Sequence, residues 1–374
     1  MIAGLVVVGC NEQARKKEPV IESVNEPARK KEPVTESVNE PSVEQPSIDE
    51  IIKEVNASGT ITDEQAASLS EVRTLHLNGL TSITNEQAES LIRDDLLFKG
   101  VQELHLNGLT SINDVQAESL GKIKMLHLNG LTSITNEQAE SLIIGDQYGA
   151  GLELNGLTSI TDAQAESLGK IWELWLNGLT SLNDEQAKGL ANLTETLQLN
   201  GLASLTDVQV EILSNYRARR ALGLDGLTSI TDKQAESLSK VTAITLNGLT
   251  SLTDEQVARL SKDFRLDGVE LDGLTSLTDA QAESLSKVKI LNLNSLTSIT
   301  DEQVERLAKV EGYLELNGLT TITDEQATSL SKVESLSLNS LTTITDAQAE
   351  SLSKVGYLEV PEDLQPLIDK FKNE

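Results

Sequence analysis

The sequence predicts an α/β solenoid, in which short parallel strands stack into one sheet and short helices cover its other side. Two observations carry this prediction. The pattern Leu-x-Leu-Asn-Gly-Leu-Thr-Ser-Ile-Thr-Asp-x-Gln-Ala-x-x-Leu recurs twelve times in 374 residues, mostly at intervals of 22 or 23 residues. A unit of that length cannot bury its own apolar face, but stacked units can. Hydrophobic residues make up 38% of the chain and aromatic residues only 2%, which suits narrow aliphatic layers.

The first ten residues are apolar and end in the only cysteine of the chain, Cys10. The stretch Val7-Val8-Gly9-Cys10 resembles a bacterial lipobox, in which the cysteine is diacylated and becomes the N-terminus after cleavage. We therefore expect residues 1–10 to be a lipoprotein-type signal segment with Cys10 as the lipidation site. No Lys or Arg precedes the apolar run, and the run is shorter than a usual signal core. The alternative is an apolar N-terminal segment with a free or buried thiol.

Residues 11–46 predict a disordered tether. A 14-residue unit rich in Pro, Glu, Lys and Ser runs from Ala14 to Pro27 and recurs almost unchanged from Ala28 to Pro41. Its sparse apolar residues follow neither a helical nor a strand period, so they cannot bury enough surface to offset the entropy lost on ordering. A flexible chain of this length spans on the order of 35 Å. Such a tether would hold a folded module off a membrane.

Residues 47–73 are expected to form the N-terminal cap of the stack, because the end of a solenoid needs a cover with a polar outer side. Ser47-Ile48-Asp49-Glu50 has the Ser-x-x-Glu form of a capping box and predicts a short helix to about Val55. The stretch from Thr62 to Leu69 repeats the helical half of the recurring pattern without its strand.

Each coil between residues 74 and 357 begins with a strand and a tight turn. In Leu291-Asn292-Leu293 two leucines alternate with a polar residue, which is the period of a half-buried strand. Asn-Gly, or Asn294-Ser295 in this coil, then turns the chain, and a glycine there tolerates a positive φ. The turn amides recur in register, so we expect them to hydrogen-bond successive backbones. This ladder consists of Asn78, Asn107, Asn129, Asn155, Asn177, Asn200, Asp225, Asn247, Asp272, Asn294, Asn317 and Asn339.

The second half of each coil predicts a short helix. In Thr300-Asp301-Glu302-Gln303 the Thr hydroxyl can cap the backbone amide of Gln303 while the Gln side chain reaches back, which is the reciprocal capping box. The capping position is Thr in ten copies and Asn in two, and the Gln is present in all twelve. Val304 and Leu307 lie three residues apart and are expected to face the core.

Residues 358–374 are expected to close the other end of the stack. Leu358-Glu359-Val360 opens a thirteenth strand that does not continue into a coil. From Pro361 onward the apolar residues fall on one helical face, which predicts a C-terminal capping helix. These residues are Leu364, Leu367, Ile368 and Phe371.

Over about residues 60–360 the repeat resembles the leucine-rich repeat (LRR), and most closely its cysteine-containing class. That class has Cys where this chain has Leu80 or Leu109, and Leu where this chain has Ala88 or Ala117. The coils here are shorter than those of that class. The resemblance implies a curved solenoid of about twelve coils plus caps, with the parallel sheet on the concave side and helices on the convex side. It also implies protein binding, although a fold does not fix a ligand.

The residue between the two leucines of each strand would lie on the exposed face of the sheet. All three histidines occupy this position in the first three coils, as His76, His105 and His127, and Glu153 follows. Neighbouring strands lie about 4.8 Å apart, and three imidazoles with a carboxylate could hold Zn²⁺. A straight ladder suits tetrahedral ligation poorly, and repeat duplication alone would copy a histidine. Metal binding therefore stays an alternative, and we expect no metal or other cofactor.

Two aromatic residues are candidate anchors on the concave face. Trp175 continues the column of the histidines, and Tyr313 lies one column over. An exposed aromatic ring on such a sheet suits a protein or a sugar. The alternative is that Trp175 packs on Met125 and its other neighbours.

Four coils carry insertions between the helix and the next strand, on an edge where binding loops often lie. These insertions hold much of the aromatic and arginine content of the chain. The arginines would engage an acidic ligand or, as we favour, pair with helix carboxylates. The candidate binding residues are Tyr148, Tyr216, Arg217, Arg219, Arg220 and Phe264.

The formal charge of −29 and the pI near 4.4 argue against binding to nucleic acid or to anionic lipid, because both need dense Lys and Arg. No Gly-rich phosphate loop, metalloprotease motif or paired cysteine and histidine is present, so we expect no enzyme. The sequence predicts a lipid-anchored protein of the bacterial cell envelope, periplasmic or surface-exposed, whose solenoid binds another macromolecule, with protein as the favoured class. Two alternatives stay open: a self-associating surface-layer protein, and a carbohydrate- or metal-binding module that uses the concave face.

Overall fold

The computed structural model of the chain describes residues 46–92, 100–143, 149–214, 221–262 and 266–372. The repeat-containing unit begins at Pro46. The expected signal segment with Cys10 and the tether up to residue 45 lie outside the described residues. So do the candidate insertion residues Tyr148, Tyr216, Arg217, Arg219, Arg220 and Phe264.

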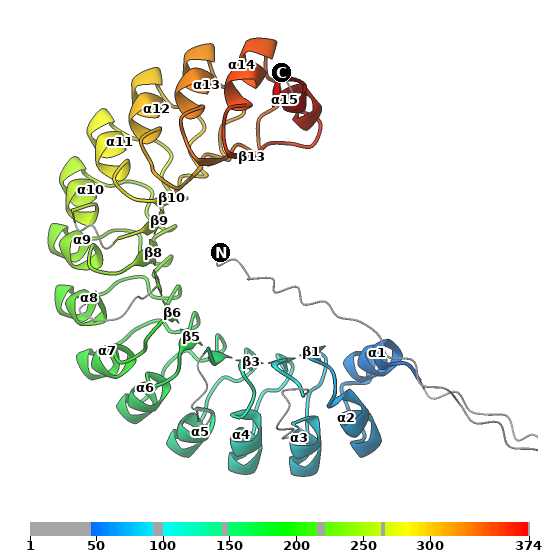
Figure 1. Cartoon of the computed structure of the whole chain (residues 1–374). Helices are drawn as coiled ribbons and strands as arrows, with labels where there is room; N and C mark the ends of the chain where they lie inside the picture. Colours follow the sequence, from blue (N-terminus) through cyan, green and yellow to red (C-terminus); the bar gives the residue numbers. More distant parts are fainter. Residues whose placement is uncertain (1–45, 93–99, 144–148, 215–220, 263–265, 373–374) are drawn as a thin grey trace, which may run out of the picture. The chain divides into compact units, whose positions relative to one another are not determined.

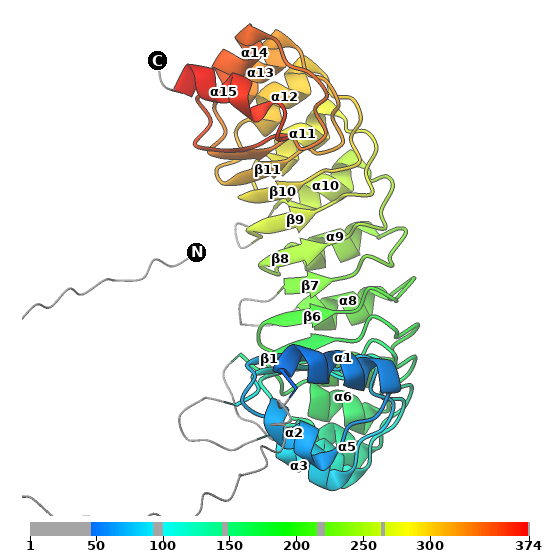
Figure 2. The same cartoon turned by 90° about the vertical axis from the view of Figure 1, so that its right-hand side faces the viewer.

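Each described coil contributes one three-residue strand to a parallel sheet of thirteen strands, which pair in the order of the chain (Figure 1). The register keeps equivalent residues side by side, so that Leu75 pairs with Leu104 and His76 with His105. Figure 2 looks onto the concave side and shows the strands stacked one above another. The strands are β1 (Thr74–His76), β2 (Glu103–His105), β3 (Met125–His127), β4 (Gly151–Glu153), β5 (Glu173–Trp175), β6 (Thr196–Gln198), β7 (Ala221–Gly223), β8 (Ala243–Thr245), β9 (Gly268–Glu270), β10 (Ile290–Asn292), β11 (Tyr313–Glu315), β12 (Ser335–Ser337) and β13 (Tyr357–Glu359).

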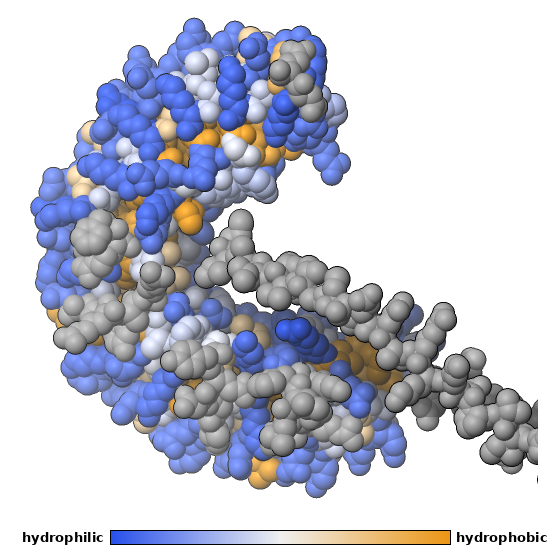
Figure 3. Space-filling view, in the orientation of Figure 1, coloured by the Kyte–Doolittle hydropathy of each residue, from blue (hydrophilic) through white to orange (hydrophobic). Residues whose placement is uncertain are grey.

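Helices α2 to α14 lie on the convex side of the sheet, and α1 and α15 lie at its two ends (Figure 1). The outer surface of the helices is largely hydrophilic (Figure 3). No described helix is long and apolar enough to cross a lipid bilayer. The helices are α1 (Ile48–Ser58), α2 (Asp63–Leu69), α3 (Asn85–Leu91), α4 (Asp114–Leu120), α5 (Asn136–Ser141), α6 (Asp162–Leu168), α7 (Asp184–Leu190), α8 (Asp207–Ser214), α9 (Asp232–Leu238), α10 (Asp254–Leu260), α11 (Asp279–Leu285), α12 (Asp301–Leu307), α13 (Asp324–Leu330), α14 (Asp346–Leu352) and α15 (Gln365–Lys372).

The predicted capping box is confirmed at the start of every helix from α2 to α14. The glutamine has a second role that the capping motif does not reveal. In α9 the Oε1 of Gln234 accepts from the backbone N–H of Thr231 at 2.8 Å, while its Nε2 donates to the carbonyl of Leu205 in the preceding coil at 2.7 Å. The same donation recurs from α3 to α14. Each glutamine therefore joins its own helix to the coil before it.

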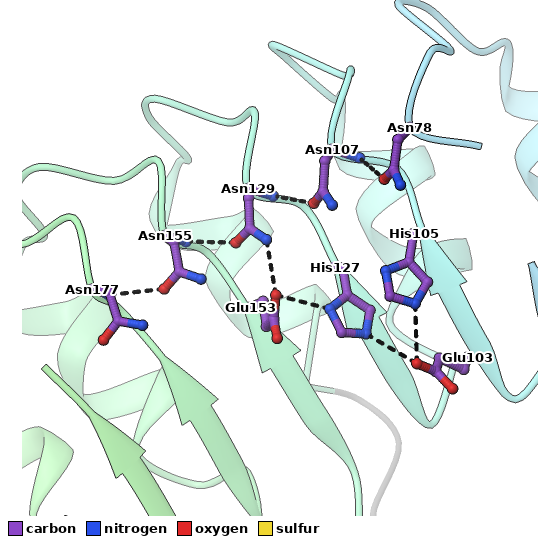
Figure 4. Close-up of polar contacts among 9 residues, drawn as sticks. All are labelled: Asn78, Glu103, His105, Asn107, His127, Asn129, Glu153, Asn155 and Asn177. Carbon is purple, nitrogen blue, oxygen red and sulfur yellow. Dashed lines mark hydrogen bonds and ion pairs between the residues drawn. The ribbon is translucent and has the colours of Figure 1, made fainter. Parts of the chain in front are cut away.

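The turn residues form the expected ladder. The side-chain oxygen of each rung accepts from the backbone N–H of the next rung, as between Asn129 and Asn155 at 2.9 Å (Figure 4). The series continues without a break from Asn78 to Asn339. Asn56 of α1 adds a rung before the first strand, because its Oδ1 accepts from Gly79 N at 2.7 Å and its Nδ2 donates to His76 O at 2.8 Å.

The prediction that the turn glycines exploit a positive φ is wrong. Among the described glycines only Gly59 and Gly149 have a positive φ, of 73° and 81°. A glycine is favoured in the ladder turn because the preceding coil approaches closely: a Cβ on Gly201 would lie 2.2 Å from the carbonyl oxygen of Asn177. Ser295 occupies the same position in another coil, so that coil accommodates a Cβ.

One continuous aliphatic core runs from Ile51 to Ile368, and Val304 and Leu307 are fully buried in it as predicted. Both capping helices form. The first helix, α1, has Ser47 as its N-cap with the predicted capping box, but it runs beyond Val55 to Ser58, where the left-handed Gly59 (φ 73°, ψ 11°) ends it. At the other end α15 buries Ile368 completely, while Leu367 and Phe371 are partly buried against the core.

Candidate functional site

Two columns of side chains cover the concave face, because the residues before and after the buried centre of each strand point the same way. The leading column consists of Thr74, Glu103, Met125, Gly151, Glu173, Thr196, Ala221, Ala243, Gly268, Ile290, Tyr313, Ser335 and Tyr357. The trailing column consists of His76, His105, His127, Glu153, Trp175, Gln198, Gly223, Thr245, Glu270, Asn292, Glu315, Ser337 and Glu359. The core, ladder and capping positions repeat almost unchanged, whereas these two columns change from coil to coil.

The columns carry negative charge. Neither column contains a Lys or Arg, and six of their residues are Glu. Burial raises the pKa of Glu270, and the carboxylates of Asp272, Asp225 and Glu315 raise it further, against the opposing hydrogen bond from Asn247. The concave face therefore has an electrostatic potential that suits a cationic ligand.

The three histidines form a stack on β1 to β3. The rings of His105 and His127 are 3.7 Å apart and inclined by 7°, and the rings of His76 and His105 are 4.1 Å apart and inclined by 37°. Glu103 of the leading column reaches across to this stack. Its Oε1 lies 3.0 Å from Nε2 of His105 and 3.6 Å from Nε2 of His127 (Figure 4).

Glu153 contacts the opposite nitrogen of the same ring. Its Oε2 lies 2.8 Å from Nδ1 of His127 and also accepts from Nδ2 of Asn129 at 2.8 Å (Figure 4). A carboxylate can only accept, so Nδ1 of His127 carries a proton. The ladder thus orients Glu153, which in turn orients the imidazole of His127.

Burial lowers the pKa of His105, and the neighbouring rings of His127 and His76 lower it further, although the hydrogen bond to Glu103 acts in the opposite direction. Burial alone would raise the pKa of Glu103, but the hydrogen bond from His105 and the attraction of the two rings hold it below its ordinary value. These directions favour a neutral imidazole at His105 beside an ionised carboxylate, which is the state in which both groups can bind a cation.

The candidate metal ligands differ from the set considered from the sequence. Among the described residues, Glu103, His105 and His127 bring one ligand atom each to within 4.8 Å of one another. His76 is exposed at the end of the stack, and Glu153 binds the far side of His127. The residue that sequence reasoning missed is Glu103. It lies two residues before His105, and the strand period of two places both side chains on one face.

Trp175 is half-buried instead of standing exposed on the sheet. Gly151 on the neighbouring strand leaves room that Trp175 and Met125 share: a Cβ there would lie 2.6 Å from Sδ of Met125 and 3.2 Å from Cζ3 of Trp175. Atoms of Met125 and of the Trp175 ring therefore both lie close to Gly151, and the ring presents only part of its surface.

A second group of anchors lies on β10 to β13. Tyr313 is half-buried and directs its hydroxyl to Oε2 of Glu359 at 3.4 Å, while the hydroxyl of Tyr357 donates to Oε1 at 2.7 Å. Burial raises the pKa of Tyr313, and the bond to Glu359 raises that of Tyr357. Tyr357 and Ile290 are 56% and 45% exposed, which makes them the accessible apolar residues of this end. Sequence reasoning missed Tyr357 because it precedes the strand of the expected cap.

The geometry of the coils identifies the fold. Each coil has a strand with alternating aliphatic residues, Leu-x-Leu in most coils, on the concave side, a ladder turn with Asn or Asp, and a capped helix on the convex side. This is the fold of a leucine-rich-repeat solenoid. No protein-family model and no curated protein sequence matches the chain.

Similar solved structures include an internalin from Listeria monocytogenes, with 16% sequence identity, a TM-score of 0.43, and coverage of 82% of this chain and 92% of the internalin. The leucine-rich-repeat-containing protein LegL7 from Legionella pneumophila has 15% identity and a TM-score of 0.48, and the match covers 63% of this chain and 94% of LegL7. A chain of the Toll–Spatzle complex from Drosophila has 15% identity and a TM-score of 0.38, with coverage of 75% of this chain and 45% of that one.

Proposed function

We propose that the LRR solenoid is a non-catalytic module whose concave face binds a partner protein with a basic surface. The observation that carries this proposal is the contrast between scaffold and surface within one chain. The buried leucines, the ladder and the capping boxes repeat in almost every coil, while the two concave columns change from one coil to the next. A surface built only for stability would repeat with the coils, whereas recognition of one partner requires different side chains at different places.

The charge of the columns supports the choice of partner. Glu103, Glu153, Glu270, Glu315 and Glu359 lie on this face without any Lys or Arg in either column. Complementary charge accelerates encounter and fixes the orientation of binding. The half-buried ring of Trp175 and the exposed Tyr357 and Ile290 would supply apolar contacts, which carry most of the affinity in protein interfaces.

The anchoring part of the proposal rests on the sequence of the N-terminal segment. Lipidation at Cys10 would attach the chain to a membrane of the bacterial cell envelope, and residues 11–46 would give the LRR solenoid reach toward its partner. Cell fractionation tests this part: the wild type is expected in the membrane fraction and a Cys10→Ser variant in the soluble fraction. The same distribution for both proteins would contradict lipid anchoring.

The binding part is tested by capture from envelope extracts with the tagged full chain. The concave variant Glu270→Gln/Glu315→Gln/Glu359→Gln is expected to retain less than about a tenth of the partner that the wild type captures, given that each buried interface charge is worth more than 1 kcal/mol. The charge-matched control is the convex variant Glu64→Gln/Glu137→Gln/Glu325→Gln, which changes three exposed helix residues and is expected to capture like the wild type. A Trp175→Ala variant tests the aromatic anchor on the same face.

Equal loss in the concave and convex variants would show that net charge alone matters and would contradict a concave binding site. If no partner is captured and the full chain self-associates in light scattering, the surface-layer alternative replaces the proposal. A captured partner without a basic surface would keep the concave site only if Trp175→Ala reduces capture.

A further inference from the structure

Nε2 of His127 is a buried polar atom of the concave face. The imidazole is nine-tenths buried, with 10% of the side chain exposed, yet this atom has no hydrogen-bond partner among the described residues. Because Nδ1 donates to Glu153, a neutral ring has its lone pair on Nε2. A buried acceptor without a partner has lost its hydrogen bonds to water without replacement, which destabilises the folded state, so a ligand that binds the lone pair would remove this cost.

The lone pair of His127 faces a second acceptor. Oε1 of Glu103 lies 3.6 Å from Nε2 of His127, beyond hydrogen-bond distance, and 3.0 Å from Nε2 of His105. A nitrogen lone pair and a carboxylate oxygen that face each other repel, and a cation held between them converts this repulsion into two attractive contacts. These two atoms and Nε2 of His105 lie within 4.8 Å of one another.

We propose that Oε1 of Glu103, Nε2 of His105 and Nε2 of His127 form a binding site for a divalent transition metal ion such as Zn²⁺. Two imidazoles and one carboxylate are a ligand set that Zn²⁺ takes readily, whereas Ca²⁺ and Mg²⁺ prefer oxygen ligands. Three ligands from the chain leave a fourth position to water or to a side chain of a bound partner. The site does not depend on the proposed binding of a basic protein.

The surroundings of His127 match those of a metal-bound histidine. Such a ring donates its other N–H to a carboxylate, which fixes the tautomer and strengthens the ligand. Here Nδ1 of His127 donates to Glu153 at 2.8 Å, and Asn129 of the ladder holds the same carboxylate oxygen at 2.8 Å. The structural ladder therefore supplies the outer shell of the site.

Metal binding requires one local movement. The rings of His105 and His127 are inclined by only 7°, so their in-plane lone pairs run nearly parallel, while one metal needs them to converge at about 2.0–2.1 Å. The proposal therefore requires a rotation of the His105 ring about its Cβ–Cγ bond. His105 stays neutral, because its proton moves from Nε2 to Nδ1 when Nε2 becomes a ligand.

The test measures Zn²⁺ affinity in the full chain by competition with a chromophoric chelator. Every protein carries Cys10→Ser, so that the thiol does not bind the metal. We expect one Zn²⁺ per chain, and an affinity at least ten-fold lower in each of His105→Gln, His127→Gln and Glu103→Gln. His76→Gln is the matched control: it belongs to the same column one coil earlier, and we expect its affinity to stay within three-fold of the wild type.

Because His127 is buried, its variant is interpreted only if the circular dichroism spectrum and the thermal midpoint match the wild type. His105→Gln and Glu103→Gln lie on the more exposed side and decide the matter by themselves. Unchanged affinity in these two variants, an equal loss in His76→Gln, or equal competition by Ca²⁺ would each overturn the proposal in favour of adventitious binding to an acidic surface. Failure to bind one Zn²⁺ per chain would likewise overturn the proposal.

Discussion

At the scale of single residues, the acidity of the concave face acts most directly on Glu270. This side chain is half-buried on β9, and its hydrogen bond from Asn247 is long, at 3.5 Å. Burial raises its pKa, and the carboxylates of Asp272, Asp225 and Glu315 act in the same direction. The charged form of Glu270 therefore destabilises the folded state, yet the chain has this residue on the proposed binding face.

A Glu270→Gln substitution is expected to stabilise the protein at neutral pH. The folded-state pKa of Glu270 lies above its unfolded value of 4.5. The contribution of Glu270 to folding stability is therefore fully present below about pH 4.5, where the carboxyl group is protonated, and is lost as the pH rises through the folded-state pKa. Urea unfolding should show a gain of roughly 0.5 kcal/mol at pH 7.5 and none at pH 4. Glu325→Gln on the convex side is the control without an effect, and a gain of equal size at both pH values would contradict the electrostatic explanation.

Contacts between single residues were predictable from the sequence only where both residues belong to one strand. The alternation of Glu103, Leu104 and His105 is enough to place the carboxylate beside the imidazole, since residues two apart share a face. The pairing of His127 with Glu153 required the register between β3 and β4, and it also required the rotamer that Asn129 imposes. The half-burial of Trp175 depended on the absence of a side chain at Gly151, one strand away.

At the scale of elements, the glutamine of each helix joins two structures. The capping half of its role was predictable, because the bond between Thr231 and Gln234 spans three residues. The hydrogen bond to the preceding coil was not predictable, because Leu205 lies 29 residues before Gln234 and contacts it only when the coils stack. Asn56 is a similar case: a residue of α1 extends a ladder that the sequence places in turns.

Replacement of Gln234 by Ala is expected to lower the free energy of unfolding by about 2 kcal/mol or more, because the N–H of Thr231 and the carbonyl of Leu205 both lose a partner in a site that is 6% exposed. Urea unfolding followed by circular dichroism measures the change. Lys233→Ala, one residue earlier in α9, removes only a solvent-exposed ion pair with Glu211 and should change stability by less than about 0.5 kcal/mol. Similar effects of the two substitutions would show that the bond between coils adds nothing to capping.

At the scale of the whole molecule, the repeat period was sufficient to predict the parallel sheet and the stacking order. A pattern that returns mostly every 22 or 23 residues with two aliphatic residues per strand leaves the coils no other way to bury them. The curvature, with strands inside and helices outside, came from the resemblance to leucine-rich repeats. The concave columns could be located from the sequence, but their burial and contacts could not, because each depends on the coils before and after it.

The ends of such a stack limit its integrity, since each coil contacts only its neighbours. Ile368 of α15 is fully buried and packs over the last coil, where α15 meets α14. An Ile368→Asp substitution buries a charge and removes this apolar contact, so α15 should detach at a cost of about 3 kcal/mol or more. The detached end exposes the aliphatic face of the last coil, which a second chain can cover.

Multi-angle light scattering over a range of concentrations should therefore show higher association for Ile368→Asp than for the wild type, and limited proteolysis should cleave near Pro361 first. Ile368→Val keeps the apolar contact and should associate like the wild type, with a loss of only about 1 kcal/mol. The remaining coils should stay folded in the Asp variant, because a defect at one end of a linear array does not remove the contacts of coils further along. Complete cooperative unfolding of the variant would contradict this view and would indicate that α15 stabilises the full length of the solenoid.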